Sequence, residues 1–335
     1  MNSLGPVWAE HWLPLLVTAV GLAIWGGLYA IFGREYRESD ARRYVREPDD
    51  WTPIEVGYVW RWGRLTVVDL TAVTVDLVRR GVLRLTQDGA AADGMRTHTA
   101  GEAQYLQWIR DDGGLTESER YLISHILFPD ASVGSSKPIT DIHAAQALDP
   151  PKASARFFRW QELATKECRH IRLIDPKSSV AMGVGMALGL LMVTSAFEVA
   201  QFTTSHYAFL PAAAGLLLVP ASVAIRRRNP EAAQALCRWQ AFRRYLLDFS
   251  QLAEQTAPAV AIWEKYLVLA ITLNVAKEAF REFSRAHPQI AEVGIAAGYP
   301  GVVQAFIWGL SVAFDLGRRG GRSEGVQRSD APRNS

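Results

Sequence analysis

Two long uncharged segments near the middle of the chain constrain its fold more than any other feature. They are Val180–Phe197 and Ala208–Ile225, and each is about as long as a helix that crosses the apolar core of a bilayer. Pro211 and Pro220 lie in the second segment, where proline is tolerated because neighbouring groups satisfy the freed carbonyls. The pair predicts a transmembrane hairpin over residues 178–226. A buried hairpin in a large soluble core is the alternative.

Lysines and arginines flank the hairpin on both sides, whereas its connection, Glu198–Tyr207, is nearly free of positive charge. The flanking basic residues are Arg169, Arg172, Lys177, Arg226, Arg227 and Arg228. The positive-inside rule therefore predicts that the connection lies outside the cytoplasm and that both flanks lie inside.

A third uncharged segment, Trp12–Phe32, lies near the N-terminus. Five arginines follow it: Arg34, Arg37, Arg42, Arg43 and Arg46. This asymmetry predicts a span with its N-terminus outside, and we expect an anchor (residues 1–33) because Glu10 and His11 do not make a signal-peptide n-region. Small residues recur at four-residue spacing on one face, at Ala19, Ala23 and Gly27. We expect this face either to pack on the hairpin or to face lipid.

A cytoplasmic module is predicted over residues 51–177, after a charged linker over residues 34–50. Thr66–Arg80 has helical spacing of apolar residues, and Gly81 is placed to end that helix as a C′ glycine. Val82–Thr86 alternates like a strand. A turn-rich tip follows, and a second strand is expected at Met95–Thr99.

The next helix is predicted from a capping box, Thr116-x-x-Glu119. It should end before Pro129, and Asp130–Pro138 is interpreted as a loop. Two further helices are expected at Ile139–Leu148 and Ala153–His170. The order of two helices and a short strand pair is similar to winged-helix modules at the level of fold.

Residues 227–290 are predicted to be a cytoplasmic helical region. An apolar stripe recurs at three- and four-residue intervals: Leu236, Trp239, Phe242, Leu246, Phe249 and Leu252. A second helix is expected over Val260–Ala286, and its apolar stretch Tyr266–Ala276 is too short to span a bilayer, so we interpret it as a core helix. Because the hairpin brings its two flanks together, we expect residues 51–177 and residues 231–286 to pack against each other.

The C-terminal part holds one more apolar stretch, residues 291–316, which Gly298–Gly301 interrupts. Spanning there would carry Arg318 and Arg319 outside, against the positive-inside rule, so an interfacial or packed helix is favoured over a fourth span. The tail, residues 317–335, is polar and glycine-rich and is predicted to be disordered.

Searches for catalytic patterns find no P-loop, no H-E-x-x-H, no G-x-S-x-G and no C-x-x-C. Gly183, Gly185 and Gly189 have the wrong spacing for a dinucleotide fingerprint and are interpreted as helix-packing residues. Cys168 and Cys237 are expected to be free thiols.

Other polar residues also have a structural interpretation. Cys168 and His170 have too few neighbouring ligands for a metal site. Asp69 and Asp76 lie seven residues apart and could be paired carboxylates, but an exposed polar helix face is the preferred interpretation. Glu198 is placed at the outer end of a span, where its carboxylate reaches the interface. We therefore predict no catalytic, cofactor-binding or metal site.

Four short segments, in order, resemble the predicted membrane proteins of domain of unknown function 2207. They are Asp76-Leu-Val-Arg-Arg-Gly81-Val-Leu83, Glu119 to Phe128, Trp239-x-x-Phe242-x-x-Tyr245-Leu246, and Trp263-Glu-Lys-Tyr266-Leu267. The resemblance covers most of residues 47–285 and implies the membrane and cytoplasmic half of such a protein, without the β-rich extracytoplasmic domain that family members usually carry. Val268 and Asn274 stand where the family pattern has proline and glycine. The resemblance implies no activity and no functional residues.

The sequence thus predicts a mainly α membrane protein with three transmembrane helices and a small α+β, winged-helix-like cytoplasmic module. We expect a non-enzymatic protein of the plasma (inner) membrane, with its N-terminus outside and its C-terminus in the cytoplasm. Its expected role is that of an interaction or scaffold protein, which contacts the bilayer and either a protein partner or a second copy through cytoplasmic helices.

Two alternatives remain open. A membrane-tethered DNA-binding regulator would need a basic recognition face, yet Thr116–Phe128 carries only one arginine, Arg120. The net charge of +2 does not indicate a nucleic-acid binder either. An accessory subunit of a transport complex is the second alternative, because three spans without a central ionisable residue do not suggest an independent transporter. No small-molecule ligand or cofactor is implied.

Overall fold

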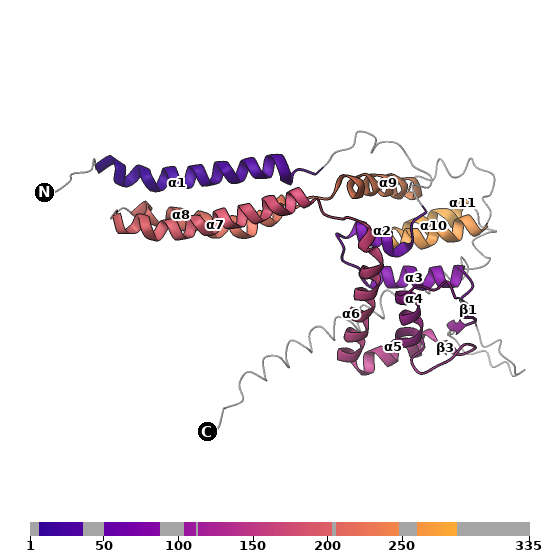
Figure 1. Ribbon diagram of the computed structural model, residues 1–335. Helices are drawn as coiled ribbons and strands as arrows, with labels where there is room; N and C mark the ends of the chain where they lie inside the picture. The colour runs from indigo at the N-terminus through magenta and orange to yellow at the C-terminus, as the bar shows by residue number, and fades with distance from the viewer. Residues whose placement is uncertain are drawn as a thin grey trace, which may run out of the picture. The chain divides into compact units, whose positions relative to one another are not determined.

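The computed structural model describes residues 7–35, 50–87, 104–111, 113–202, 206–247 and 260–286. These residues form a mainly helical structure with a small three-stranded sheet (Figure 1). The chain divides into two compact units: unit 1 comprises residues 1–40 and 171–237, and unit 2 comprises residues 41–170 and 238–335.

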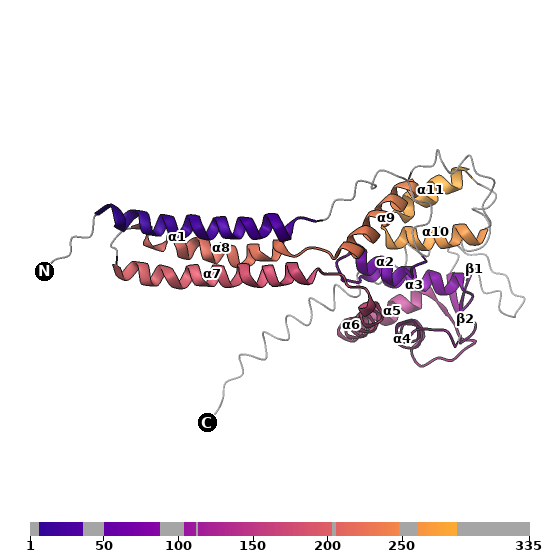
Figure 2. The ribbon, with the colours of Figure 1, turned by 45° about the horizontal axis from the view of Figure 1, so that its top comes forward.

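Unit 1 contains three helices that are long and apolar enough to cross a membrane, as the sequence predicts: Trp12–Gly33, Pro176–Glu198 and Tyr207–Ile225. Helix α1 and the π-turn η1 form the first, α7 the second, and η5, α8 and η6 the third. Their bounds are α1 Val7–Leu28, η1 Tyr29–Gly33, α7 Pro176–Phe202, η5 His206–Phe209, α8 Leu210–Ala221 and η6 Ser222–Ile225. All three lie side by side, and α1 contacts both α7 and α8 (Figure 2).

Glycines let α7 and α8 approach closely. A Cβ added at Gly189 would lie 2.9 Å from the carbonyl oxygen of Gly215, and one added at Gly185 would lie 2.7 Å from the Ser222 hydroxyl. Gly183 has no atom within 4 Å of such a Cβ. The helix-packing interpretation is therefore confirmed for Gly185 and Gly189 and is wrong for Gly183.

Helix α1 turns a different face to the hairpin than the small-residue spacing suggested. Pro14, Thr18 and Gly21 are buried, whereas Ala19 and Ala23 are exposed. The side chain of Met192 lies against Gly21. Of the two interpretations of the small-residue face, packing on the hairpin is wrong, because Thr18 and Gly21 are buried instead and Trp25 donates a hydrogen bond to the Ser222 hydroxyl.

Unit 2 begins with two helices and a sheet. The elements are α2 Pro53–Trp60, α3 Val67–Arg79, β1 Leu83–Gln87, β2 Gln104–Trp108 and β3 Ser136–Pro138. Strand β2 pairs antiparallel with both β1 and β3, with Leu83 opposite Trp108 and Tyr105 opposite Pro138. Gly81 has φ +73°, so it ends α3 in the left-handed conformation that a C′ glycine provides.

Strand β2 was not predicted from the sequence, and one loop assignment needs correction. The partner of β1 is β2, because the alternating residues Gln104–Trp108 provide Leu106 for the core. The segment interpreted as a loop, Asp130–Pro138, ends in β3, which pairs with the open edge of β2.

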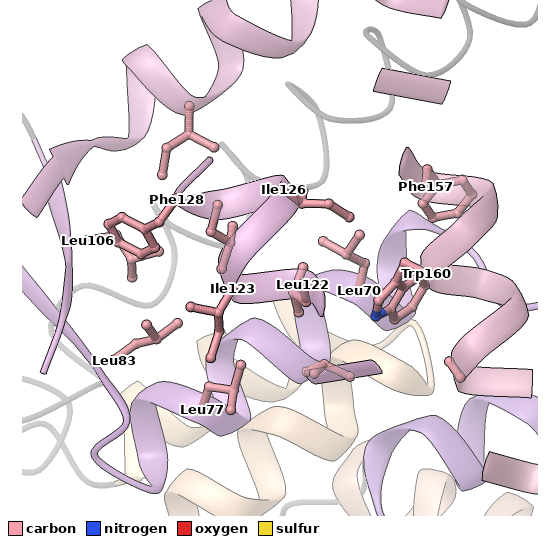
Figure 3. Close-up of a cluster of buried hydrophobic side chains, with 14 of the residues drawn as sticks. Leu70, Leu77, Leu83, Leu106, Leu122, Ile123, Ile126, Phe128, Phe157 and Trp160 are labelled. Carbon is pink, nitrogen blue, oxygen red and sulfur yellow. The ribbon is translucent and has the colours of Figure 1, made fainter. Parts of the chain in front are cut away.

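Helices α4 to α6 complete the core of this part. Their bounds are α4 Glu117–Tyr121, the π-turn η3 Leu122–Leu127, α5 Ile139–Leu148, α6 Pro150–Glu167 and the 3₁₀ turn η4 Cys168–His170. The predicted capping box is confirmed, since the Glu119 N–H donates to the Thr116 hydroxyl and the Thr116 N–H donates to the Glu119 carboxylate at 3.0 Å. Leu70, Leu106, Leu122 and Trp160 meet in one apolar cluster between α3, the sheet and α6 (Figure 3).

The segment after the hairpin forms α9 Pro230–Leu247, α10 Val260–Thr272 and α11 Ala276–Ala286. Every residue from Tyr266 to Leu273 is buried, which confirms the core-helix interpretation of this stretch. Helix α10 packs against α2 and α3, and Trp239 of α9 contacts Trp51 with ring centroids 6.2 Å apart. The expected packing between the two flanks of the hairpin is confirmed.

The single helix expected over Val260–Ala286 is wrong, because the chain turns sharply between α10 and α11. Asn274 has φ +57°, and the Val275 N–H donates back to the Ala270 carbonyl at 2.9 Å. This left-handed residue ends α10 in the manner of a C-cap.

Several expectations fall outside the described residues. They concern most of the linker over residues 34–50, the tip and strand over residues 88–99, the stripe residues Phe249 and Leu252, the apolar helix over residues 291–316, and the tail over residues 317–335.

Candidate functional site

Helix α3 buries both of its aspartates. The side chain of Asp69 is fully buried and Asp76 is 8% exposed. The interpretation of these residues as an exposed polar face is therefore wrong, because α10 packs against a side of α3 that was expected to face solvent. The two carboxylates are not paired with each other: Asp69 pairs with Arg61, whereas Asp76 pairs with Arg79 and Arg80.

Asp69 lies at a junction of three segments. One oxygen of its carboxylate accepts a very short hydrogen bond from Arg61 Nη1, and the other accepts hydrogen bonds from the backbone N–H (2.7 Å) and hydroxyl (3.0 Å) of Thr66. Arg61 also donates through Nη2 to the Thr272 carbonyl at the end of α10, at 2.5 Å. One guanidinium thus joins the segment after α2, helix α3 and helix α10.

Burial and charge act in opposite directions on Asp69. Burial raises the pKa of the Asp69 carboxyl, while Arg61 and the Thr66 hydrogen bonds act to lower it. Gly57 makes room for this pair, since any Cβ there would collide with the Asp69 carboxylate. Asp69, Arg61 and Gly57 therefore work as one structural unit.

A second ion network joins the end of α3 to the start of α4. Asp76 pairs with Arg79 at 2.8 Å and Arg80 pairs with Glu119 at 2.6 Å. Glu119 is the same residue that completes the Thr116 capping box. The network therefore connects the start of α4 to the C-terminal end of α3.

A third network lies in unit 1, where the three spans end together. We call this the span base, and define it as Glu35, Asp175, Ser178, Arg227 and Arg228. Arg227 pairs with Asp175 at 2.8 Å and Arg228 pairs with Glu35 at 2.8 Å. Arg227 also donates to the carbonyl of Ile31 at 3.2 Å.

Backbone hydrogen bonds reinforce the span base. Ile174 and Arg228 form an antiparallel β-bridge, the Asp175 N–H donates to the Arg227 carbonyl, and the Asn229 N–H donates to the Leu173 carbonyl. The entry to α7 and the exit from η6 are therefore held together as two short paired strands. Sequence reasoning grouped Arg226, Arg227 and Arg228 as one flank, but two of the three are buried.

The two cysteines are free thiols, as expected. Burial raises the pKa of the Cys168 thiol to about 12, with smaller contributions from Glu55 and Glu167. Across the described residues there is no group of three or more His, Cys, Asp or Glu side chains placed to hold a metal ion.

Sequence reasoning missed Arg227 and Arg228 as buried residues and missed Arg61 as the partner of the buried Asp69. One local signal was present for Asp69, because Thr66-x-x-Asp69 is itself a capping box. The arginines gave no such signal, because the contacts of Arg61 with Thr272 and of Arg228 with Glu35 join residues about two hundred positions apart in the sequence. The buried ionic groups described above connect elements of the fold, which favours a structural role for each.

Comparison with known proteins gives one match. A family model described as "Predicted membrane protein (DUF2207) C-terminal domain" matches residues 41–283. No curated protein and no solved structure matches the chain.

Proposed function

The chain belongs to the DUF2207 family of predicted membrane proteins, and we propose that it is a membrane-anchored interaction protein whose unit 2 binds a protein partner. The observation that carries this proposal is a pair of large apolar side chains that unit 2 leaves exposed on α6 and just before it. Leu148, at the corner between α5 and α6, is 85% exposed, and Phe158 on α6 is 48% exposed. Neither belongs to a helix that could cross a membrane.

The outward side of α6 has a composition suited to protein recognition. Phe158 lies on the same helix as the exposed residues Lys152, Arg159 and Lys166. Aromatic residues and arginines are enriched in the energetically dominant parts of protein interfaces. Arg159 forms an ion pair with Glu162 at 2.7 Å on this side of the helix.

We further propose a non-enzymatic role, the plasma membrane as location, and a topology with the N-terminus outside and the C-terminus in the cytoplasm. The buried carboxylates support the first part, because the arginines bound to Asp69, Asp76 and Asp175 occupy them within the fold. The basic residues at one end of all three spans support the orientation.

The test is affinity purification of the full-length protein from native membranes in mild detergent, with mass spectrometry and mass photometry of the eluate. We expect a stoichiometric protein partner, or a second copy, that is lost with Phe158→Asp. Val133→Asp is the matched control, because Val133 is 47% exposed but lies on the loop before β3. A homogeneous monomer without a partner, or equal binding by both variants, would contradict the proposal.

The order α2, α3, β1, β2 supports a winged-helix-like description of residues 53–108, which we propose as a description of element order. DNA reading is less well supported, because a recognition helix must enter the major groove. Helix α3 has nine buried residues among its thirteen and is covered by α10.

A role as an accessory subunit of a transporter has weaker support than protein binding. The only Asp, Glu, Lys or Arg residues in the three candidate spans are Lys177 and Glu198, at the two ends of the second. Ionisable residues that form transport pathways lie deeper in the membrane.

A further inference from the structure

We propose that a docking site for the headgroup of an anionic phospholipid lies beside the span base and is formed by Arg34, Lys177 and Arg226. All three side chains are exposed. Each lies within two residues of the end of a candidate span, on Trp12–Gly33, Pro176–Glu198 and Tyr207–Ile225 respectively. We call these three residues the basic triad.

Close backbone contacts bring Arg34 and Arg226 together. A Cβ added at Gly33 would lie 3.2 Å from the Cα of Ile225. Arg34 directly follows Gly33 and Arg226 directly follows Ile225, so the two cations leave the bundle from adjoining backbone. A Cβ at this distance would be tightly packed against the third span, so glycine favours the approach and the first and third spans end close together.

The paired exit strands add Lys177. The Ile174–Arg228 bridge and the Asp175 N–H to Arg227 O hydrogen bond run the two segments antiparallel. Continuing this register places Arg226 beside Pro176, which directly precedes Lys177. The triad thus combines one cation from each span, although the three residues are up to 192 positions apart in sequence.

The ion pairs of Arg227 and Arg228 explain why the nearby carboxylates do not neutralise the positive charges of the triad. Arg227 and Arg228 occupy the two nearby carboxylates, Asp175 and Glu35. Among the described residues, no carboxylate forms an ion pair with Arg34, Lys177 or Arg226. The three consecutive arginines therefore have different roles: Arg227 and Arg228 neutralise the local acids, and the Arg226 side chain remains exposed.

Position selects the ligand. Lysine and arginine side chains at the end of a membrane helix reach the headgroup region, and several cations beside a span bind acidic lipids. A phosphodiester headgroup offers oxygen acceptors to two guanidinium groups and one ammonium group at once. We commit to a phospholipid rather than soluble phosphate because the triad lies where the bilayer surface must be.

The test uses full-length protein in nanodiscs of phosphatidylcholine with a minor fraction of phosphatidylglycerol, followed by native mass spectrometry of the retained lipids. The test variant carries Arg34→Gln, Lys177→Gln and Arg226→Gln. We expect it to retain phosphatidylglycerol at least tenfold more weakly than the unchanged protein, since each cation contributes about fivefold at a membrane surface.

A matched control variant carries Arg64→Gln, Arg84→Gln and Lys277→Gln, three exposed cations of unit 2, and should retain the lipid normally. A charge-conserving variant, Arg34→Lys with Lys177→Arg and Arg226→Lys, should also bind and shows that loss is not misfolding. Equal retention by the test variant and the unchanged protein, or equal loss in the control variant, would overturn the proposal. This outcome is independent of whether a protein partner is found for unit 2.

Discussion

At the scale of single residues, Arg61 has the largest structural role in unit 2. Its guanidinium reaches the Asp69 carboxylate and the Thr272 carbonyl, and the Asp69 side chain that it neutralises is fully buried. Removing one partner of a buried ion pair leaves the other charge without compensation, which costs more than the pair itself contributes.

Arg61→Ala should therefore destabilise the protein by about 3–5 kcal/mol. Arg64→Ala, an exposed arginine three residues later, should change stability by less than about 0.5 kcal/mol. Thermal unfolding of the purified proteins in one detergent measures both, and similar melting temperatures for the two variants would contradict this role.

The same pair predicts a pH dependence. Burial raises the pKa of the Asp69 carboxyl, and Arg61 is the charge that opposes this shift. A carboxyl whose pKa is raised in the folded state makes the folded protein less stable as the pH rises through that pKa. The deficit of Arg61→Ala relative to the unchanged protein should thus be larger at about pH 8 than at about pH 5. Adding Asp69→Asn should abolish the difference between the two pH values.

Cys168 gives a chemical prediction. With a pKa of about 12, only about one thiol in ten thousand is ionised at pH 8, and the thiolate is the reactive form. Maleimide labelling of the native protein should therefore modify Cys237, which is half-buried, and spare Cys168. Labelling after denaturation should modify both, whereas rapid modification of Cys168 in a native Cys237→Ser variant would be contrary evidence.

At the scale of elements, helix ends account for much of what local sequence can predict. Gly81 ends α3 and the Thr116 box begins α4 as expected, because caps are local patterns with few solutions. The uncharged spans can also be predicted from the sequence, because the bilayer requires about twenty consecutive apolar residues of any helix that crosses it.

Other elements depend on partners far along the chain. Strand β3 has only three residues, so it is too short to show an alternating pattern. Its pairing with β2 is a tertiary contact that the local sequence does not predict. The buried state of Asp69 depends on α10, almost two hundred residues later. The turn between α10 and α11 had a signal: Asn274 occupies the place of a glycine in the resembling family, and both residues tolerate positive φ.

Asn274 is testable on this ground. Asn274→Gly should preserve or slightly raise stability, whereas Asn274→Val should cost at least about 1–2 kcal/mol because a β-branched residue resists the left-handed region. Thermal unfolding compares them. Equal stability of the glycine and valine variants would show that the turn does not need this conformation.

The crossing of α7 and α8 gives the corresponding prediction for unit 1. Gly215→Val would push the two helices apart at Gly189 and cost about 1–3 kcal/mol through overpacking. Gly183→Val is the control, because Gly183 lies on the same hairpin with open space around it. Size-exclusion chromatography after heating should show earlier loss of the folded protein for the first variant only.

At the scale of the whole molecule, unit 2 is built from chain on both sides of the hairpin. A protein that ends after Leu247 lacks α10 and α11, so the faces of α2 and α3 that α10 covers become exposed to water. We expect this truncation to aggregate on size-exclusion chromatography, whereas one that ends after Ala286 keeps the described contacts and should remain dispersed. A dispersed, thermally stable product from the shorter chain would contradict the shared construction of unit 2.

Because α10 covers α3 in the folded protein, α3 stays partly uncovered during synthesis until α10 has been made. About 180 residues separate the two helices, and at a ribosome speed of about 5–20 residues per second α3 waits roughly 10–40 s for its partner. During this interval the nascent chain must also insert the hairpin, while the apolar surface of α3 is still bare. A chaperone or the insertion machinery that shields residues 67–79 during translation would therefore determine how much of the newly made protein reaches its folded form.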